Sequence, residues 1–124
     1  MNSTELSWAA GFFDGEGNFG SFISKANDRK SGRKRYIVAQ IAQVDVRPLE
    51  RFLRAVGLGS VHGPYIDKRP THAPIYQWRY SGAIGCQQLT ELLWPYLSEP
   101  KREQIEAAWE KYHASGLRVR NRKS

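Results

Sequence analysis

The chain has 124 residues, of which 40% are hydrophobic and four are tryptophan, a size and composition that suit one globular domain with a single core. Its formal net charge of +7 indicates a polyanionic partner. The one cysteine, Cys86, excludes an internal disulfide, and no apolar run approaches the ~18 residues of a membrane span. Because the N-terminus also lacks a signal-peptide pattern, we expect an intracellular protein that is cytoplasmic, organellar or nucleoid-associated.

The positive charge is concentrated in two segments. Residues 25–36 carry a net charge of +5 and residues 117–124 a net charge of +4, which leaves about −2 for the rest of the chain. Either both segments are simply solvated, or they contact phosphate groups. In a small basic protein this localisation favours phosphate contact.

The first predicted helix begins at a cap formed by Ser3 or Thr4 and carries two acids near its end. Asp14 and Glu16 alternate with Gly15 and Gly17, where the helix must stop. Carboxylates are unfavourable at the negative end of a helix dipole. The pattern therefore indicates a cation site or a reaction at this place.

Small residues in the same helix predict a close helix neighbour. Ala9, Ala10, Gly11 and Gly15 remove side-chain bulk, and a glycine inside a helix costs about 1 kcal/mol relative to alanine. An equivalent helix from a second copy of the chain would account for Gly11.

Residues 18–26 and 33–44 are predicted strands, joined by a turn at 27–32. The second strand alternates, with Ile37, Ala39 and Ile41 on one face and Lys34, Tyr36, Val38 and Gln40 on the other. Such a hairpin suits a DNA groove, but an ordinary half-buried sheet would show the same alternation. The basic turn favours the DNA groove.

The next segments predict a helix and a second hairpin. Asp45 caps a helix whose apolar stripe is Leu49, Phe52, Leu53 and Val56, and Gly57 ends it. Strands come next, at about 60–66 and 74–80. In the later strand the aromatic residues Tyr76, Trp78 and Tyr80 are expected to cover the core, with Gln77 and Arg79 on the opposite face.

The last third of the chain is predicted to be helical. One stripe, expected to face the core, consists of Leu89, Leu92, Leu93 and Tyr96 and is interrupted at Pro95. A further helix begins at Ser98 and Glu99 and turns Ile105, Ala108, Trp109 and Tyr112 inward. Gly116 is expected to end this helix, so that residues 1–116 form the domain and 117–124 a basic tail.

Residues 9–17, AAGFFDGEG, resemble the LAGLIDADG motif of homing endonucleases. The stretch matches the motif's A-G pair, both acids and the final glycine, whereas Ala9 replaces the leading leucine and Glu16 the commoner aspartate. The order helix, hairpin, helix, hairpin, helices is similar to that family's αββαββα domain over about residues 4–114. The turn at 57–61 and the segment 94–97 with Lys101 also resemble the family.

The resemblance implies an α+β domain with an extra C-terminal helix and an antiparallel, saddle-shaped sheet for DNA. Family members with one motif act as homodimers, so the 6–15 helices of two copies would pack at the centre. The residues implied at that dimer interface are Ala9, Ala10, Gly11, Phe13 and Asp14.

The implied activity is site-specific double-strand cleavage of a pseudo-palindromic DNA target, leaving 3′ overhangs and serving intron or intein mobility. Glu16, the Gly15 carbonyl and Asp14 would hold Mg²⁺, while Ca²⁺ would occupy the site without supporting cleavage. Gln43 resembles a polar residue that family members place near the scissile phosphate.

A basic residue is also expected there, around the end of the last strand. The sequence has Ser81-Gly82-Ala83 at that place, with no lysine. Arg79 is the nearest cation on the expected face and is taken as the third catalytic residue, while Lys101 is a more distant possibility.

The residues expected to contact DNA lie on the two hairpins: Ser24, Lys25, Arg29, Lys30, Arg33, Lys34, Tyr36, Gln40, His62, Lys68, Arg69, Gln77 and Arg79. The alternative function is a non-catalytic DNA-binding regulator or an RNA-binding intron maturase of the same fold. The retained Glu16 favours the enzyme, and the missing lysine favours the alternative.

The histidines and the cysteine indicate no further chemistry. His62, His72 and His113 lack the spacing of a zinc motif, although His62 could contact DNA. Cys86 lies near a predicted helix start, where a buried inert thiol is expected.

Overall fold

The structure is a computed structural model that describes residues 2–23, 35–66 and 73–123, the last range with side chains to residue 114. The elements are, in chain order, α1 (Ser3–Glu16), β1 (Gly17–Ile23), β2 (Arg35–Gln43), α2 (Val46–Val56), β3 (Ser60–Tyr65), β4 (Ile75–Ser81), α3 (Ala83–Leu93), the short 3₁₀ helix η1 (Trp94–Tyr96) and α4 (Glu99–Lys123). This order confirms the predicted α+β class. Within these ranges, none of the helices combines the length and the apolar character that a membrane span requires.

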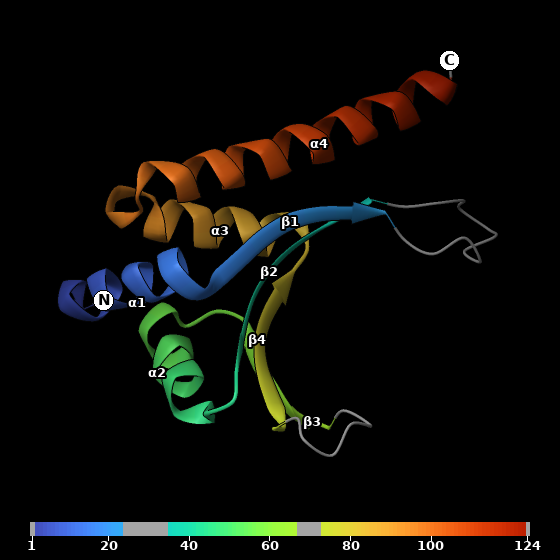
Figure 1. The fold of residues 1–124 in the computed structure, drawn as a ribbon. Coiled ribbons are helices and arrows are strands. Elements are labelled where there is room, and N and C mark those ends of the chain that lie inside the picture. The colour runs from blue at the N-terminus through green and yellow to red at the C-terminus, as the bar shows by residue number, and fades with distance from the viewer. Residues whose placement is uncertain (1, 24–34, 67–72, 124) are drawn as a thin grey trace.

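The four strands form one antiparallel sheet in the order β1-β2-β4-β3. The sheet is strongly curved, and helices α1, α2 and α3 lie on its convex side, whereas its concave face is not covered by any helix of the described chain (Figure 1). The outermost strands are β1 and β3. Helix α4 packs against β1, and the register between β3 and β4 shifts between His62 and Tyr65.

The core fills the space between the convex face and the helices. Trp78 at the centre of β4 is fully buried, meets the Phe52 ring edge-on at 4.7 Å between centroids, and donates from Nε1 to the Leu58 carbonyl at 2.9 Å. Phe13 of α1 stacks on Phe52 at 6.2 Å. One aromatic cluster thus joins α1, α2 and the sheet. The buried indole N–H needs an acceptor, and the Leu58 carbonyl supplies it.

Helix α1 begins one residue earlier than its expected caps. Asn2 is the N-cap, and its Oδ1 accepts hydrogen bonds from the Thr4 and Glu5 amides at 2.9 and 3.2 Å, so neither Ser3 nor Thr4 has that role. Asparagine is as good a cap as serine, and sequence alone does not choose between neighbouring candidates.

Helix α2 agrees closely with its sequence signals. The Asp45 carboxylate accepts from the Arg47 amide at 3.0 Å, which confirms the predicted N-cap. Gly57 ends the helix with a φ of 68°, a left-handed conformation that favours glycine. The stripe faces the core, with Leu49, Phe52 and Val56 buried.

Two predictions about the last third of the chain are wrong. Helix α4 continues through Gly116 to Lys123, because one interior glycine costs only about 1 kcal/mol and the surrounding residues favour a helix. Tyr96 is exposed, since the 3₁₀ turn at Pro95 rotates it away from the core, and Leu97 is buried instead.

Candidate functional site

The acidic end of α1 meets the end of β2. Glu16 is the last residue of α1 and is exposed, and its Oε1 accepts a hydrogen bond of 3.0 Å from the Gln43 side-chain amide. The sheet register explains this meeting, because Gly17 pairs with Ile41 and thereby brings the residue before β1 close to the last residue of β2. Two predicted site residues, 27 positions apart in the chain, therefore lie together.

Gly17 permits the sharp change from α1 to β1. A Cβ atom at this position would lie 2.3 Å from the Phe13 ring, a distance that real Cβ atoms do not show. The strand therefore leaves the helix directly over a buried aromatic ring, and this close approach fixes the backbone next to Glu16.

Asp14 serves a different purpose from its neighbour Glu16. Its Oδ1 accepts hydrogen bonds from the Ser98 amide at 3.1 Å and from the Ser98 hydroxyl at 2.8 Å, directly before α4 begins. This acid joins the end of α1 to the start of α4 and does not share the Glu16–Gln43 contact. In this structure Asp14 therefore braces two helices, and its expected role as a metal ligand stays a prediction.

Lys101 is the cation that the described contacts bring to the junction of α1 and β1. Its Nζ donates to the Gly17 carbonyl at 2.8 Å and to the Gln104 side chain at 2.7 Å, and Gln104 in turn donates to Asn18 at 3.2 Å. Burial lowers the pKa of the Lys101 ammonium, and the negative charge of Asp14 opposes this shift. Arg79, the expected third catalytic residue, pairs with Gln40 on the concave face, on the other side of the pleat from Gln43.

The exposed face of α1 differs from the expected dimer interface. Ala9, Ala10 and Phe13 are fully buried in this chain's own core, so they have no surface left for a partner. Ser7, Gly11 and Gly15 are exposed at a spacing of four residues, and a Cβ atom at either glycine would meet nothing within 4 Å.

Polar side chains cross the concave face of the sheet in rows. Asn18, Gln40, Arg79 and Ser60 are in register on the four strands, and Ala42, Gln77 and His62 form the next row. Ser60 Oγ lies 2.8 Å from His62 Nε2. Ser60, His62 and Arg79 also line a groove of about 560 Å³ beside the turn from α2 to β3. The aromatic residues of β4 point to the core, as predicted.

Eight of the residues expected to contact DNA lie outside the described ranges. They are Ser24, Lys25, Arg29, Lys30, Arg33, Lys34, Lys68 and Arg69. The side chains of the basic C-terminal residues also lie outside the described part of the chain.

No group of three histidine, cysteine, aspartate or glutamate side chains that could hold a metal ion occurs among the described residues. The junction nevertheless offers oxygen donors that fit a hard cation. Glu16 presents an exposed carboxylate. The last carbonyls of α1, Gly15 among them, lie at the helix end, where no further turn of the helix supplies N–H donors to them.

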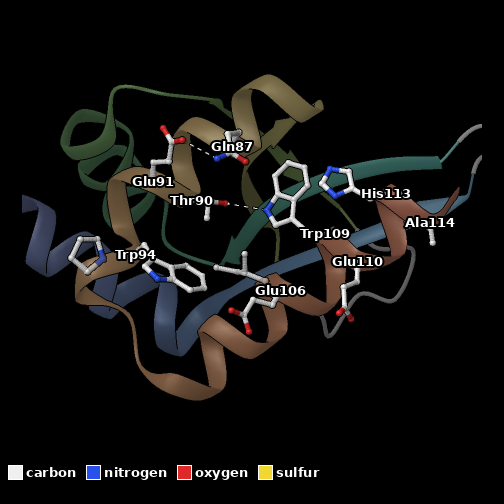
Figure 2. A pocket seen from close by; sticks show the side chains of 11 residues that line it. Gln87, Thr90, Glu91, Trp94, Glu106, Trp109, Glu110, His113 and Ala114 are labelled. Atoms are coloured by element: carbon white, nitrogen blue, oxygen red, sulfur yellow. Dashed lines mark hydrogen bonds between the residues drawn. The ribbon is translucent and has the colours of Figure 1, made fainter. Parts of the chain in front are cut away.

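One apolar groove is separate from the acidic junction. It lies between α3 and α4, has a volume of about 1030 Å³, and is lined by Trp94, Ile105 and Trp109 with Glu91, Glu106 and Glu110 around it (Figure 2). Neither Glu16 nor Gln43 reaches it. Cys86 is buried, and burial raises the pKa of its thiol to about 11, so the expected inert thiol is confirmed.

Comparison with known proteins identifies the fold. No family model and no curated protein matches the chain. Among solved structures it is similar to the homing endonuclease I-CvuI in complex with the I-CreI target (24% identity, TM-score 0.68, 84% of this chain and 62% of that chain). It is also similar to the homing endonuclease I-TnaI (22% identity, TM-score 0.68, 92% of this chain and 76% of that chain). A third similar structure is the LAGLIDADG meganuclease I-AabMI bound to uncleaved DNA (21% identity, TM-score 0.66, 95% of this chain and 38% of that chain).

The chain thus spans 62% of the length of I-CvuI and less of I-AabMI, and every identity is low. Three-dimensional likeness extends over 84% to 95% of this chain in these three comparisons. The chain has the fold of the LAGLIDADG homing endonuclease domain.

Proposed function

We propose that this protein is a homodimeric, Mg²⁺-dependent, site-specific DNA endonuclease. The observation that carries the proposal is the Glu16–Gln43 contact at the end of α1, in a fold shared with DNA endonucleases. An exposed carboxylate at the negative end of a helix is unfavourable in the chain by itself, and a bound cation would remove that cost.

Glu16 and the Gly15 carbonyl would hold the cation, together with the same groups of a second copy. When bound, Mg²⁺ would activate a water and stabilise the leaving oxygen of the scissile phosphate. Gln43 donates to one carboxylate oxygen of Glu16, Oε1, so this contact leaves Oε2 available for the cation. Asp14, which is bonded to Ser98, is not included among the proposed ligands.

Lys101 replaces Arg79 as the proposed basic residue of the site. Its ammonium donates to the Gly17 carbonyl, one residue from Glu16, and to the Gln104 side chain. A positive charge fixed at this place would offset the charge of the phosphate as it approaches the carboxylate. The reason to favour a non-catalytic role, a missing lysine, is thereby weakened.

Cleavage of both strands requires two such sites, which supports a homodimer. One chain has one acidic junction, and the exposed stripe of Ser7, Gly11 and Gly15 on α1 leaves room for the backbone of a second helix. Two concave sheets would then flank the junctions and read the major grooves of a pseudo-palindromic duplex, with cuts across the minor groove that leave 3′ overhangs.

The deciding experiment is a binding selection on random duplex DNA in Ca²⁺, after which Mg²⁺ is added and any new ends are sequenced. We expect a pseudo-palindromic sequence that is cut at its centre only after Mg²⁺ is added. The Glu16→Gln protein should bind the same sequence but cleave it at least about 100-fold more slowly.

Glu110→Gln is the matched control, because it removes an exposed acid on α4 away from the junction. It should cleave like the unmodified protein. If the recovered sequence stays intact in Mg²⁺, the protein binds DNA without cutting it, and equal cleavage by the Glu16→Gln protein would reject the proposed ligand.

A further inference from the structure

One part of the concave face is apolar. Phe22 of β1 pairs directly with Tyr36 of β2, and the next pair on the same face is Gly20 with Val38. Phe22 and Tyr36 are 49% and 45% exposed, although large aromatic residues are usually covered. We call these four residues the hairpin-end patch.

The Phe22 ring lies back along its own strand. A Cβ atom built on Gly20 would be 2.9 Å from the far end of that ring, so the ring covers the place where a side chain at position 20 would be. Val38, the partner of Gly20, is only 7% exposed although it belongs to the concave face and not to the core cluster. The patch is therefore an apolar surface formed by the ring, the glycine and the valine, and at β1 it borders a groove of about 280 Å³ shared with Ala107 and Lys111 of α4.

The polar row begins four residues away on the same strand. Asn18, Gln40, Arg79 and Ser60 carry donors and acceptors, whereas none of the four patch residues except Tyr36 has a side-chain polar group. The concave face thus changes from hydrogen-bonding chemistry to apolar chemistry along β1.

We propose that the hairpin-end patch recognises the 5-methyl group of thymine in the major groove. This inference rests on the proposed DNA function. The thymine methyl is the apolar group that a base pair presents there, and a phenylalanine ring is a suitable contact for it. The patch favours thymine over cytosine without a hydrogen bond, because only the methyl-bearing base buries apolar surface against Phe22.

The strand geometry gives the spacing of this readout. A strand rises about 3.4 Å per residue, close to the rise of one base pair, so four residues from Asn18 to Phe22 cover about four base pairs. Each half-site should therefore contain a preferred thymine about four base pairs from the position read by the polar row.

The test uses the duplex recovered by the selection, in which each thymine is replaced in turn by deoxyuridine, which lacks only the methyl group. At one thymine per half-site we expect binding to weaken about three- to fivefold, the effect of losing one buried methyl. Replacing that thymine by 5-methylcytosine, with guanine opposite, should bind better than the unmethylated cytosine duplex.

The protein variants separate the patch from general DNA binding. With Phe22→Ala we expect the thymine and deoxyuridine duplexes to bind equally. Gly20→Ala should also remove the discrimination, because the new methyl displaces the ring while both aromatic residues remain. Ile84→Ala is the matched control, because it removes a 79% exposed apolar side chain on α3. This variant should still discriminate between the thymine and deoxyuridine duplexes. Equal thermal melting of the variants will show that each is folded.

The outcomes are distinct. Binding to a selected duplex with no dependence on any thymine methyl, or with unchanged dependence in both the Phe22→Ala and Gly20→Ala proteins, overturns the patch proposal and leaves the proposed function standing. Failure to bind any duplex overturns both.

Discussion

Gln43 reaches Glu16 with a single hydrogen bond from its half-buried side chain to the exposed carboxylate. Replacing Gln43 by leucine removes the donor that holds the carboxylate. We predict that Gln43→Leu slows single-turnover cleavage by about 10- to 100-fold, the usual cost of losing a residue that orients a metal ligand, with little change in DNA affinity. An equal loss of affinity would instead mean that Gln43 contacts DNA. Gln77→Leu, on the concave face, is the opposite control and should change affinity before it changes rate.

Lys101 provides a prediction about pH. Burial lowers the pKa of its ammonium in the folded protein, so the unfolded chain binds this proton more strongly than the folded one. The free energy of unfolding therefore rises with pH as the ammonium loses its proton, between the lowered folded pKa and the ordinary lysine pKa of about 10.4.

Urea unfolding of the Lys101→Met protein should show a smaller rise in stability over the alkaline range than the unmodified protein. Its DNA cleavage should also be slower. Lys111 is an exposed residue of the same helix and supplies the control for stability, because the Lys111→Met protein should keep the full alkaline rise. A rise in stability that is unchanged in Lys101→Met would assign the effect to another group.

At the residue scale the sequence identifies some members of the junction and misses others. Glu16 and Gln43 can be chosen because the motif and its position mark them. From the sequence alone, Arg79 is a stronger candidate for the basic residue than Lys101. Arg79 lies near the end of a predicted strand, which can be located along the chain, whereas the position of Lys101 depends on how a later helix packs. The signal is present in Asn18, Gln104 and Lys101, but only the packing of α4 on β1 brings these residues together.

Helix α2 is stabilised at its end by one glycine. Gly57 has a φ of 68°, where a Cβ atom is strained by about 1–2 kcal/mol. We predict that Gly57→Ala lowers the free energy of unfolding by about 1 kcal/mol and that Gly57→Asn costs less, since asparagine tolerates this conformation better. Chemical denaturation of the three proteins measures both differences, and equal stability of the alanine and glycine proteins would contradict the strain.

The sequence predicts an element well when residue types that start and end it, such as helix caps, mark both of its ends. Asp45 and Gly57 bound α2, and the alternation of β2 and β4 assigns their core faces. Helix α4 shows the limit, because Gly116 has the form of a stop signal but the helix continues. Whether an interior glycine ends a helix depends on the residues after it and on tertiary contacts, which a local pattern does not contain.

The assembly of two chains depends on the exposed side of α1. We predict that Gly11→Leu separates the subunits, because the larger side chain fills the space needed by the facing helix, whereas nothing within 4 Å hinders it in the single chain. Light scattering should report the mass of one 14.2 kDa chain for the variant and of two for the unmodified protein. Glu50→Leu, on the exposed side of α2, is the control and should remain a dimer. A Gly11→Leu protein that keeps the dimer mass would place the interface elsewhere.

At the scale of the molecule the order of elements is sufficient to predict the fold, but it does not show which small residues face outward. Ala9 and Ala10 are needed inside, where they let α1 approach the sheet, and Gly11 is outside. A run of small residues does not show by itself which of them are buried and which are exposed, because that depends on how the core packs.

The outer strands of the sheet have a consequence for behaviour at high concentration. A sheet that keeps one face uncovered is exposed to pairing with other chains at its unpaired backbone edges, which leads to aggregation. Here α4 lies along β1 at one edge, and at the other edge β3 contains Pro64, which lacks an N–H, beside an irregular register. Along the residues that the structure describes, neither edge presents a regular row of hydrogen-bonding groups, so the protein can leave a broad surface open and still resist fibrous growth.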